Sequence, residues 1–206
     1  MKLSCDLDDT LVGLAKPWLK WLYDQKISFH LFKNQDVTHY SWFSDTFGHH
    51  AAEFFLKDPV KCYEGLRPIP GAQAFYIYCI ENFNTDIVTH SDQKSTEKGK
   101  TKFVKKWFGD DVNIRFFKHL PDKYKSLEGS ILVDDYPLHI INHVAHNKQP
   151  AILFNYKNEN GWGHLENYKG LIEDLNPDME LIHYATNYEE IINILEMLKN
   201  EKSFYN

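Results

Sequence analysis

Short apolar segments alternate with longer segments of helical periodicity along most of this chain. The apolar segments are rich in β-branched and aliphatic residues, as buried strands are, and lie at 1–7, 85–90, 112–117, 129–135 and 151–155, with an edge strand expected at 180–186. The helical segments lie at 14–26, 95–109, 137–147 and 187–200, and one more starts near Ala72. This alternation predicts an α/β fold with a Rossmann-like, doubly wound parallel sheet.

Residues 27–65 interrupt the alternation. This stretch is rich in aromatic and polar residues and has no strong strand signal, so we interpret it as a mostly helical insertion. The turn-forming sequence RPIPG at 67–71 follows it. Together with the helix before it, we assign 14–65 to a small helical cap inserted after the first strand, and 1–13 and 66–206 to the core domain.

Acidic and hydroxyl side chains follow three of the predicted strands at the point where each strand ends. They are Asp6, Asp8 and Asp9 after the first strand, Thr89, His90 and Ser91 at the end of the strand at 85–90, and Asp134 and Asp135 at the end of the strand at 129–135. Because the carboxyl ends of parallel strands meet at one edge of a sheet, we expect these groups to lie close together. Carboxylates so close raise one another's pKa unless a positive charge lies between them, so the pattern predicts a cation and a reaction.

The residue types at this edge are those of phosphoryl transfer. An oxygen-rich pocket suits Mg²⁺, and Asp134 and Asp135 would complete its site. Asp6 can serve both as a metal ligand and as the nucleophile. Asp8, two residues on, is placed to protonate the leaving oxygen and then to act as a base. Thr89 would bind a phosphate oxygen through its hydroxyl, and a lysine is needed to offset the charge of the transferring group.

The same motifs resemble those of haloacid-dehalogenase-like (HAD) phosphatases. DLDDT at 6–10 resembles their D-x-D-x-T signature, IVTH at 87–90 their second motif and ILVDD at 131–135 their fourth. Within this superfamily the chain resembles the 5′(3′)-deoxyribonucleotidases over roughly residues 1–155. The segments that carry this closer resemblance are YSWFSDTFG, YEGLRPIPGA, KTKFVKKWFG and LVDDYP.

The resemblance implies a HAD-like core with a small helical cap. It also implies Mg²⁺-dependent hydrolysis of (deoxy)nucleoside monophosphates through an aspartyl-phosphate. By position in the motifs, Asp6 is the nucleophile, and Asp8 is the acid and base whose backbone carbonyl also binds the metal. Of the acidic pair, Asp135 is the direct metal ligand and Asp134 lies beside it.

The resemblance also assigns residues to the phosphate group. Thr89, His90 and Lys100 match phosphate-binding positions. The lysine of the third HAD motif matches best at Lys123, although this match needs one extra residue before the acidic pair. Lys125 is therefore kept as the alternative.

In the cap, the resemblance places a nucleotide base between Trp42 and Phe43, with Leu14 below them. Three positions depart from the family pattern. Asp9 stands where a small residue is usual, His90 where serine is usual, and Tyr136 where arginine is common. These departures leave the base preference open.

Three histidines on one predicted helix have a spacing that can bind zinc. They are His139, His143 and His146. No clear fourth ligand and no general-base glutamate lie beside them in the sequence. We therefore interpret them as ordinary helix residues.

Composition limits the partners and the compartment. The chain has 23 Lys and Arg against 29 Asp and Glu, a formal charge of −6, which argues against a large nucleic-acid-binding face. No apolar run approaches the ~20 residues of a membrane span, and the early acids interrupt any signal peptide. The three cysteines without a C-x-x-C motif favour a reducing compartment. We expect a cytoplasmic protein that acts on a small nucleotide, without a membrane or a stable nucleic-acid partner, and we keep a homodimer as one alternative for its oligomeric state.

Three other functions are compatible with parts of the pattern. A HAD phosphatase could instead act on another small phosphate ester or on the 3′ or 5′ end of a nucleic acid. A phospho-accepting receiver module also has an early acidic pair, but it would carry its phosphorylated aspartate a few tens of residues later and would have no cap. A catalytically inactive relative would be expected to have lost one of the four core acids, all of which are present here.

Overall fold

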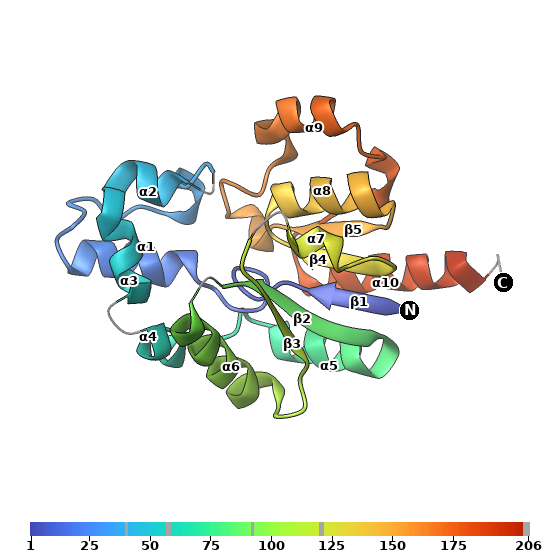
Figure 1. Cartoon of the computed structure of the whole chain (residues 1–206), viewed down its shortest axis with the longest axis horizontal. Coiled ribbons are helices and arrows are strands. Elements are labelled where there is room, and N and C mark those ends of the chain that lie inside the picture. Colours follow the sequence, from blue (N-terminus) through green and yellow to red (C-terminus); the bar gives the residue numbers. More distant parts are fainter. Residues whose placement is uncertain (40, 57–58, 92, 120–121, 204–206) are drawn as a thin grey trace.

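The computed structural model describes residues 1–206 except 40, 57–58, 92, 120–121 and 204–206, and a six-stranded sheet forms its centre (Figure 1). The strands are β1 (Lys2–Cys5), β2 (Asn84–His90), β3 (Ile114–Phe117), β4 (Ser130–Asp134), β5 (Ala151–Phe154) and β6 (Ile182–Ala185). They are parallel and lie in the order β3-β2-β1-β4-β5-β6. The strand order reverses between β1 and β4, where doubly wound sheets bind their ligands. The predicted fold class is confirmed.

The register of the central strands brings the acidic strand ends together. Cys5 of β1 pairs with Ile87 of β2 on one side and with Val133 of β4 on the other. The next backbone N–H, that of Asp6, donates to the Val133 carbonyl at 2.8 Å. Asp6 and Asp134 therefore follow paired residues of two adjacent strands and leave the sheet at the same level.

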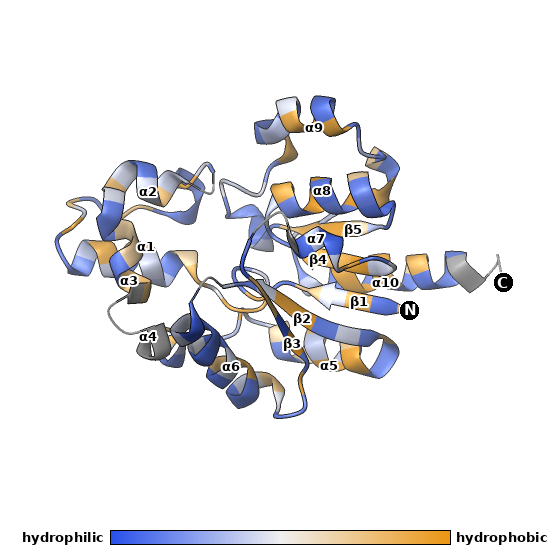
Figure 2. Ribbon diagram, in the orientation of Figure 1, coloured by the Kyte–Doolittle hydropathy of each residue, from blue (hydrophilic) through white to orange (hydrophobic). Residues whose placement is uncertain are grey.

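Helices cover both faces of the sheet. One face carries α5 (Ala72–Asn82), α6 (Lys94–Phe108) and α10 (Tyr188–Ser203), and the other carries α7 (Asp122–Lys125) and α8 (Pro137–Asn147), with α9 (Lys169–Leu175) packed on α8. Successive strand residues serve the two faces in turn, since Ile131 and Val133 join one core cluster and Leu132 joins the other. Hydrophobic and hydrophilic residues alternate along α8, as expected for a helix with one buried face (Figure 2). No helix in the described part of the chain is long and apolar enough to cross a membrane.

A helical lobe follows β1 in the sequence and lies beside the carboxyl edge of the sheet (Figure 1). Its elements are α1 (Ala15–Asp24), the short 3-10 helix η1 (Asn34–Asp36), α2 (Trp42–Phe47), the 3-10 helix η2 (Gly48–Ala52), α3 (Glu53–Leu56) and α4 (Pro59–Gly65). Its buried apolar residues, among them Leu19, Leu22 and Val37, form a cluster distinct from the two core clusters. We call this lobe the insertion. Its last helix, α4, packs against α6 of the core, and the domain boundaries at 14 and 65 stay a prediction.

Candidate active site

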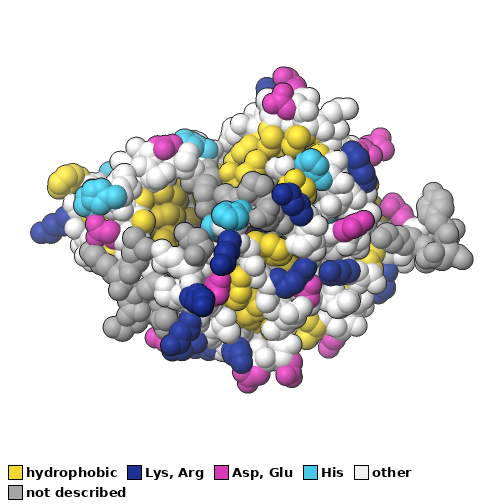
Figure 3. Space-filling model, in the orientation of Figure 1, with side chains coloured by type: hydrophobic (Ala, Val, Ile, Leu, Met, Phe, Trp, Pro, Cys, Tyr) yellow, Lys and Arg dark blue, Asp and Glu magenta, His cyan; other side chains and the backbone are white. Residues whose placement is uncertain are grey.

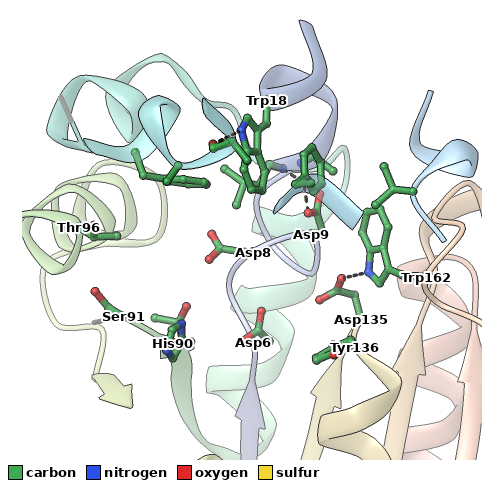
Figure 4. Close-up of a pocket in the computed structure, with 18 of the residues that line it drawn as sticks. Asp6, Asp8, Asp9, Trp18, His90, Ser91, Thr96, Asp135, Tyr136 and Trp162 are labelled. Carbon is green, nitrogen blue, oxygen red and sulfur yellow. Dashed lines mark hydrogen bonds between the residues drawn. The ribbon is translucent and has the colours of Figure 1, made fainter. Parts of the chain in front are cut away.

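A cavity of about 480 Å³ lies between the carboxyl edge of the sheet and the insertion (Figure 4). Its floor is made of strand-end residues that include Asp6, Asp8, Thr89 and Asp135, and its roof is made largely of apolar residues of the insertion. Hydrophobic side chains of the insertion (yellow) face the hollow that separates it from the core (Figure 3). The volume is that of a pocket for a small molecule.

Lys123 lies among the acids beneath the floor of the cavity. The residue is 1% exposed, and Nζ donates to Asp6 Oδ1 and, at 2.5 Å, to Asp134 Oδ2. Burial alone would lower the pKa of Lys123, but the charges of Asp134 and Asp6 outweigh it and raise this pKa above its usual value. Burial also raises the pKa of Asp6, and the ammonium group of Lys123 counteracts that shift. Lys125, the alternative from the sequence, is exposed.

Asp134 is held by three hydrogen-bond donors. Its Oδ2 accepts from Lys123 Nζ and, at 2.9 Å, from His139 Nδ1, and its Oδ1 accepts from the Tyr136 backbone N–H at 2.9 Å. Burial would raise the pKa of Asp134, but His139 and Lys123 hold it well below its usual range. His139 is therefore not an ordinary helix residue. The signal in the sequence is its place in the first turn of the helix that directly follows an acidic strand end.

Lys100 contacts both the loop after β1 and the carboxyl end of β2. Its buried Nζ donates to Asp8 Oδ2 at 2.6 Å, to Thr89 Oγ1 at 2.7 Å and to the His90 carbonyl at 2.6 Å. Asp8 also accepts a hydrogen bond from the Tyr63 hydroxyl at 3.0 Å. The His90 ring lines the cavity and is within 3.0 Å of the Lys118 carbonyl through Nε2. One ammonium group thus lies beside the carboxylate and the hydroxyl that the sequence analysis assigned to the reaction.

Asp135 is fixed from two directions. Its Oδ2 accepts from Trp162 Nε1 at 2.7 Å, and its Oδ1 is 3.4 Å from the Thr10 hydroxyl. Burial raises the pKa of Asp135 well above its usual value, and the neighbouring carboxylates add to the shift. The loop that carries Thr10 is itself supported from α10, because the Tyr188 hydroxyl donates to the Thr10 carbonyl at 2.7 Å.

Asp9 has a structural role at this edge. Its Oδ1 accepts from the backbone N–H groups of Leu14 at 2.9 Å and Ala15 at 3.1 Å, where α1 begins. The first N–H groups of a helix have no partner within it, and the helix dipole favours a negative charge there. Asp9 therefore anchors the start of α1 to the loop after β1.

The acidic floor fits a divalent cation. Ligand oxygens of Asp6, Asp134 and Asp135 all lie within 4.8 Å of one another, and the three residues are buried. With Asp8, four acidic side chains lie close to the two buried lysines, so acids outnumber lysines here, and the neighbouring carboxylates add to the raised pKa of Asp135. Carboxylate oxygens are ligands that Mg²⁺ prefers. Asp134 already accepts three hydrogen bonds, whereas Asp135 accepts from neutral donors only, which favours Asp135 as the direct ligand.

The insertion brings Phe43 and Leu14 to the cavity but not Trp42. Trp42 and Phe43 are neighbours in α2, so their side chains point about 100° apart around the helix. Trp42 packs edge-on against other aromatic rings of the insertion. Trp18 of α1 lines the cavity instead and stacks on Phe43, with ring centroids 3.7 Å apart and planes inclined by 4°. The expected Trp42–Phe43 pair is therefore wrong, and a Trp18–Phe43 stack replaces it.

Two further side chains at the site had no assigned role in the sequence analysis. Tyr63 reaches Asp8 from α4, and Trp162 reaches Asp135 from the loop after β5. Both contacts join residues far apart in sequence, so no local pattern reports them. For Trp162, the sequence shows only an isolated tryptophan within the segment NENGWG at 158–163.

Comparisons with solved structures identify the fold. A haloacid dehalogenase-like family hydrolase from Streptococcus pneumoniae superposes with a TM-score of 0.58 at 12% identity, over 94% of this chain and 97% of that one. A haloacid dehalogenase-like hydrolase from Burkholderia xenovorans does so with a TM-score of 0.52 at 11% identity, over 87% of this chain and 97% of that one. No protein-family model and no curated protein matches the sequence. The chain thus has the fold of HAD-like hydrolases.

Proposed function

We propose that this chain is a Mg²⁺-dependent phosphomonoesterase that hydrolyses (deoxy)nucleoside monophosphates through a phosphoryl group on Asp6. One observation carries the proposal. Asp6 and Asp8 follow the central strand at the floor of the cavity, each paired with a buried lysine. A rim of acids that served only solubility would need neither the burial nor the lysines, because charges in water are already solvated.

The residues support a two-step reaction. An Asp6 oxygen attacks phosphorus, the bond from phosphorus to the ester oxygen breaks, and the Asp8 carboxyl group gives its proton to the departing oxygen. Asp8, now a carboxylate, takes a proton from water, whose oxygen attacks the phosphoryl group and breaks its bond to Asp6. Inorganic phosphate leaves and both acids return to their starting states. Throughout, Lys100 and Thr89 bind the phosphoryl oxygens.

Two cations would balance the negative charge of the acids at the floor, namely the ammonium group of Lys123 and Mg²⁺. Lys123 offsets the negative charge shared by Asp6 and Asp134, and Asp6, Asp135 and Asp134 would hold Mg²⁺. When bound, Mg²⁺ supplies positive charge to the transferring oxygens. The resemblance to HAD phosphatases adds the backbone carbonyl of Asp8 to this set.

The cavity walls favour a monophosphate whose leaving group carries an aromatic ring. Lys100 is the only Lys or Arg among the described residues that line the cavity. The cavity therefore offers a positively charged side chain to one phosphate group but none to a second. Phe43 and Trp18 offer aromatic surface on the opposite wall. Aromatic rings bind any nucleobase, because every base has a π-face. These features support a nucleoside monophosphate over a di- or triphosphate.

Phosphate release from a panel of deoxy- and ribonucleoside monophosphates, beside a small artificial ester, tests the proposal. We expect release from nucleotides with Mg²⁺ and none with EDTA. Phosphate release from the small ester but from no nucleotide would support the proposed reaction and contradict the proposed nucleotide substrate. Release from none of them would overturn the proposal.

Replacing Phe43 by Leu separates base binding from packing. Leu keeps an apolar side chain but removes the aromatic face, and stacking contributes about 1–3 kcal/mol per base, so KM for a nucleoside monophosphate should rise about 10-fold. KM for the small ester should stay near the wild-type value. Trp42→Leu is the matched control, because Trp42 belongs to the same aromatic cluster and does not line the cavity. An equal rise in KM for both substrates would mean that Phe43 contributes only to packing of the insertion.

A further inference from the structure

The loop from 155 to 163, between β5 and α9, docks on the insertion. The Gly161 N–H donates to the Asn34 carbonyl at 3.1 Å, and Asn34 Nδ2 donates to Asn160 Oδ1 at 3.0 Å. The approach is so close that a Cβ atom at Gly161 would lie 2.4 Å from the Gln35 carbonyl oxygen and 2.7 Å from that of Val37. Core and insertion are therefore joined here by a contact that tolerates only glycine.

Hydrogen bonds within the loop also fix its shape. Asn155 is fully buried, and its side chain accepts from the Asn160 N–H at 2.9 Å and donates to the Asn160 carbonyl at 2.9 Å. A Cβ atom at Gly163 would lie 2.8 Å from Asn155 Nδ2, so the chain closes tightly around this side chain. The residue between the two glycines, Trp162, is consequently held in one place.

Trp162 contacts both halves of the molecule. Trp162 is 7% exposed and belongs to the apolar cluster of the insertion, with Val37 and Phe43. Its Nε1 donates to Asp135 Oδ2 at 2.7 Å, and Figure 4 shows it reaching Asp135 from the side opposite Asp8. A single side chain thus packs under the insertion and orients an acid of the catalytic floor.

We propose that Trp162 is a positioning residue that couples docking of the insertion to the orientation of Asp135, and so to Mg²⁺ binding. This inference rests on the proposed function, in which Asp135 is a metal ligand. With Oδ2 held by Trp162, the carboxylate has one orientation beside Asp6 and Asp134, whose ligand oxygens lie within 4.8 Å. Outer partners of this kind fix the orientation of metal-ligating side chains.

Linkage makes the coupling reciprocal. If docking of the loop favours the orientation of Asp135 that binds the ion, then the ion must favour docking of the loop by the same factor. Mg²⁺ should therefore slow hydrogen exchange at the Gly161 N–H, which is bonded to Asn34 across the contact. If Trp162 only filled space, Mg²⁺ would not change hydrogen exchange at the Gly161 N–H.

The test measures Mg²⁺ affinity by calorimetry without substrate. Trp162→Phe keeps the ring and removes the N–H donor, and we expect its Mg²⁺ Kd to rise about 10-fold. Trp21→Phe is the matched control, since Trp21 lies in the same cluster, outside the cavity lining, and its Kd should equal that of the wild type. The slowing of Gly161 exchange by Mg²⁺ should be present in the wild type and lost in Trp162→Phe.

A second variant tests the coupling from the side of the insertion. Gly161→Ala introduces the clash with the insertion backbone and leaves Trp162 intact, and it should also weaken Mg²⁺ binding. Gly170→Ala is its control, because a Cβ atom there meets nothing within 4 Å. Wild-type Mg²⁺ affinity in both Trp162→Phe and Gly161→Ala would overturn the inference, even if the wild type hydrolyses nucleotides. Weakened affinity in both, in a protein that hydrolyses no phosphate ester, would support the inference and overturn the proposed function.

Discussion

Asp6→Asn should reduce phosphate release by on the order of 10⁴-fold or more, because an amide oxygen is too weak a nucleophile to form the phosphoryl intermediate. The fold should survive, since Asn has nearly the same shape and Lys123 keeps its ion pair with Asp134. Phosphate release from the best substrate of the panel, beside circular dichroism, measures both effects.

Asp8→Asn gives the complementary result. This variant keeps the nucleophile but lacks both the acid for the leaving oxygen and the base that activates water, so the phosphoryl group should remain on Asp6 after mixing with an artificial ester whose leaving group needs no protonation. Mass spectrometry of the intact protein would detect it. Substantial turnover by Asp6→Asn, or a phosphoryl group on another residue of Asp8→Asn, would contradict the assignment of Asp6 as the nucleophile.

Lys123→Met should lower the free energy of unfolding by about 3–5 kcal/mol, because it leaves the buried carboxylates of Asp6 and Asp134 without their shared partner. Hydrolysis should fall with it. Urea unfolding without Mg²⁺ measures the loss. Adding Mg²⁺ should restore part of the stability, since the cation offsets the same charge.

Lys125→Met is the matched control for Lys123→Met. Lys125 lies in the same short helix but is exposed, so its replacement should change the free energy of unfolding by about 0.5 kcal/mol or less. Equal stability of the two variants would mean that the ion pairs of Lys123 contribute nothing net, and equal activity would remove Lys123 from the mechanism.

The strands and the acids at their ends were predictable from the sequence because both are local properties. A buried parallel strand is a short apolar run, and the carboxylates that follow it are read directly from the chain, as at Asp6 and Asp134. Parallel pairing then fixes their meeting point, since all strands share one direction. The edge strand β6 and the closing helix α10 were also predicted near their observed places.

The rest of the site depends on contacts that no local pattern encodes. The choice between Trp42 and Phe43 depends on how α2 is rotated about its axis, and Trp18 reaches the cavity only because α1 packs against α2 in this arrangement. Trp162 contacts Asp135 across 27 residues. Helix α9 was not predicted, because it has only seven residues and none of them is buried, so it shows no apolar helical period.

The hydrogen bond from Tyr188 to the Thr10 carbonyl also bears on when activity appears during synthesis. The partners of this bond are separated by 178 residues, so the loop that carries Asp6 leaves the ribosome well before the tyrosine that supports it. At 5–20 residues per second, about 10–40 s pass between them. A nascent chain therefore carries Asp6 and Asp8 before it carries the lysines, the acidic pair and the tyrosine, and under the proposed function it could not hydrolyse a phosphate ester until Tyr188 has been added.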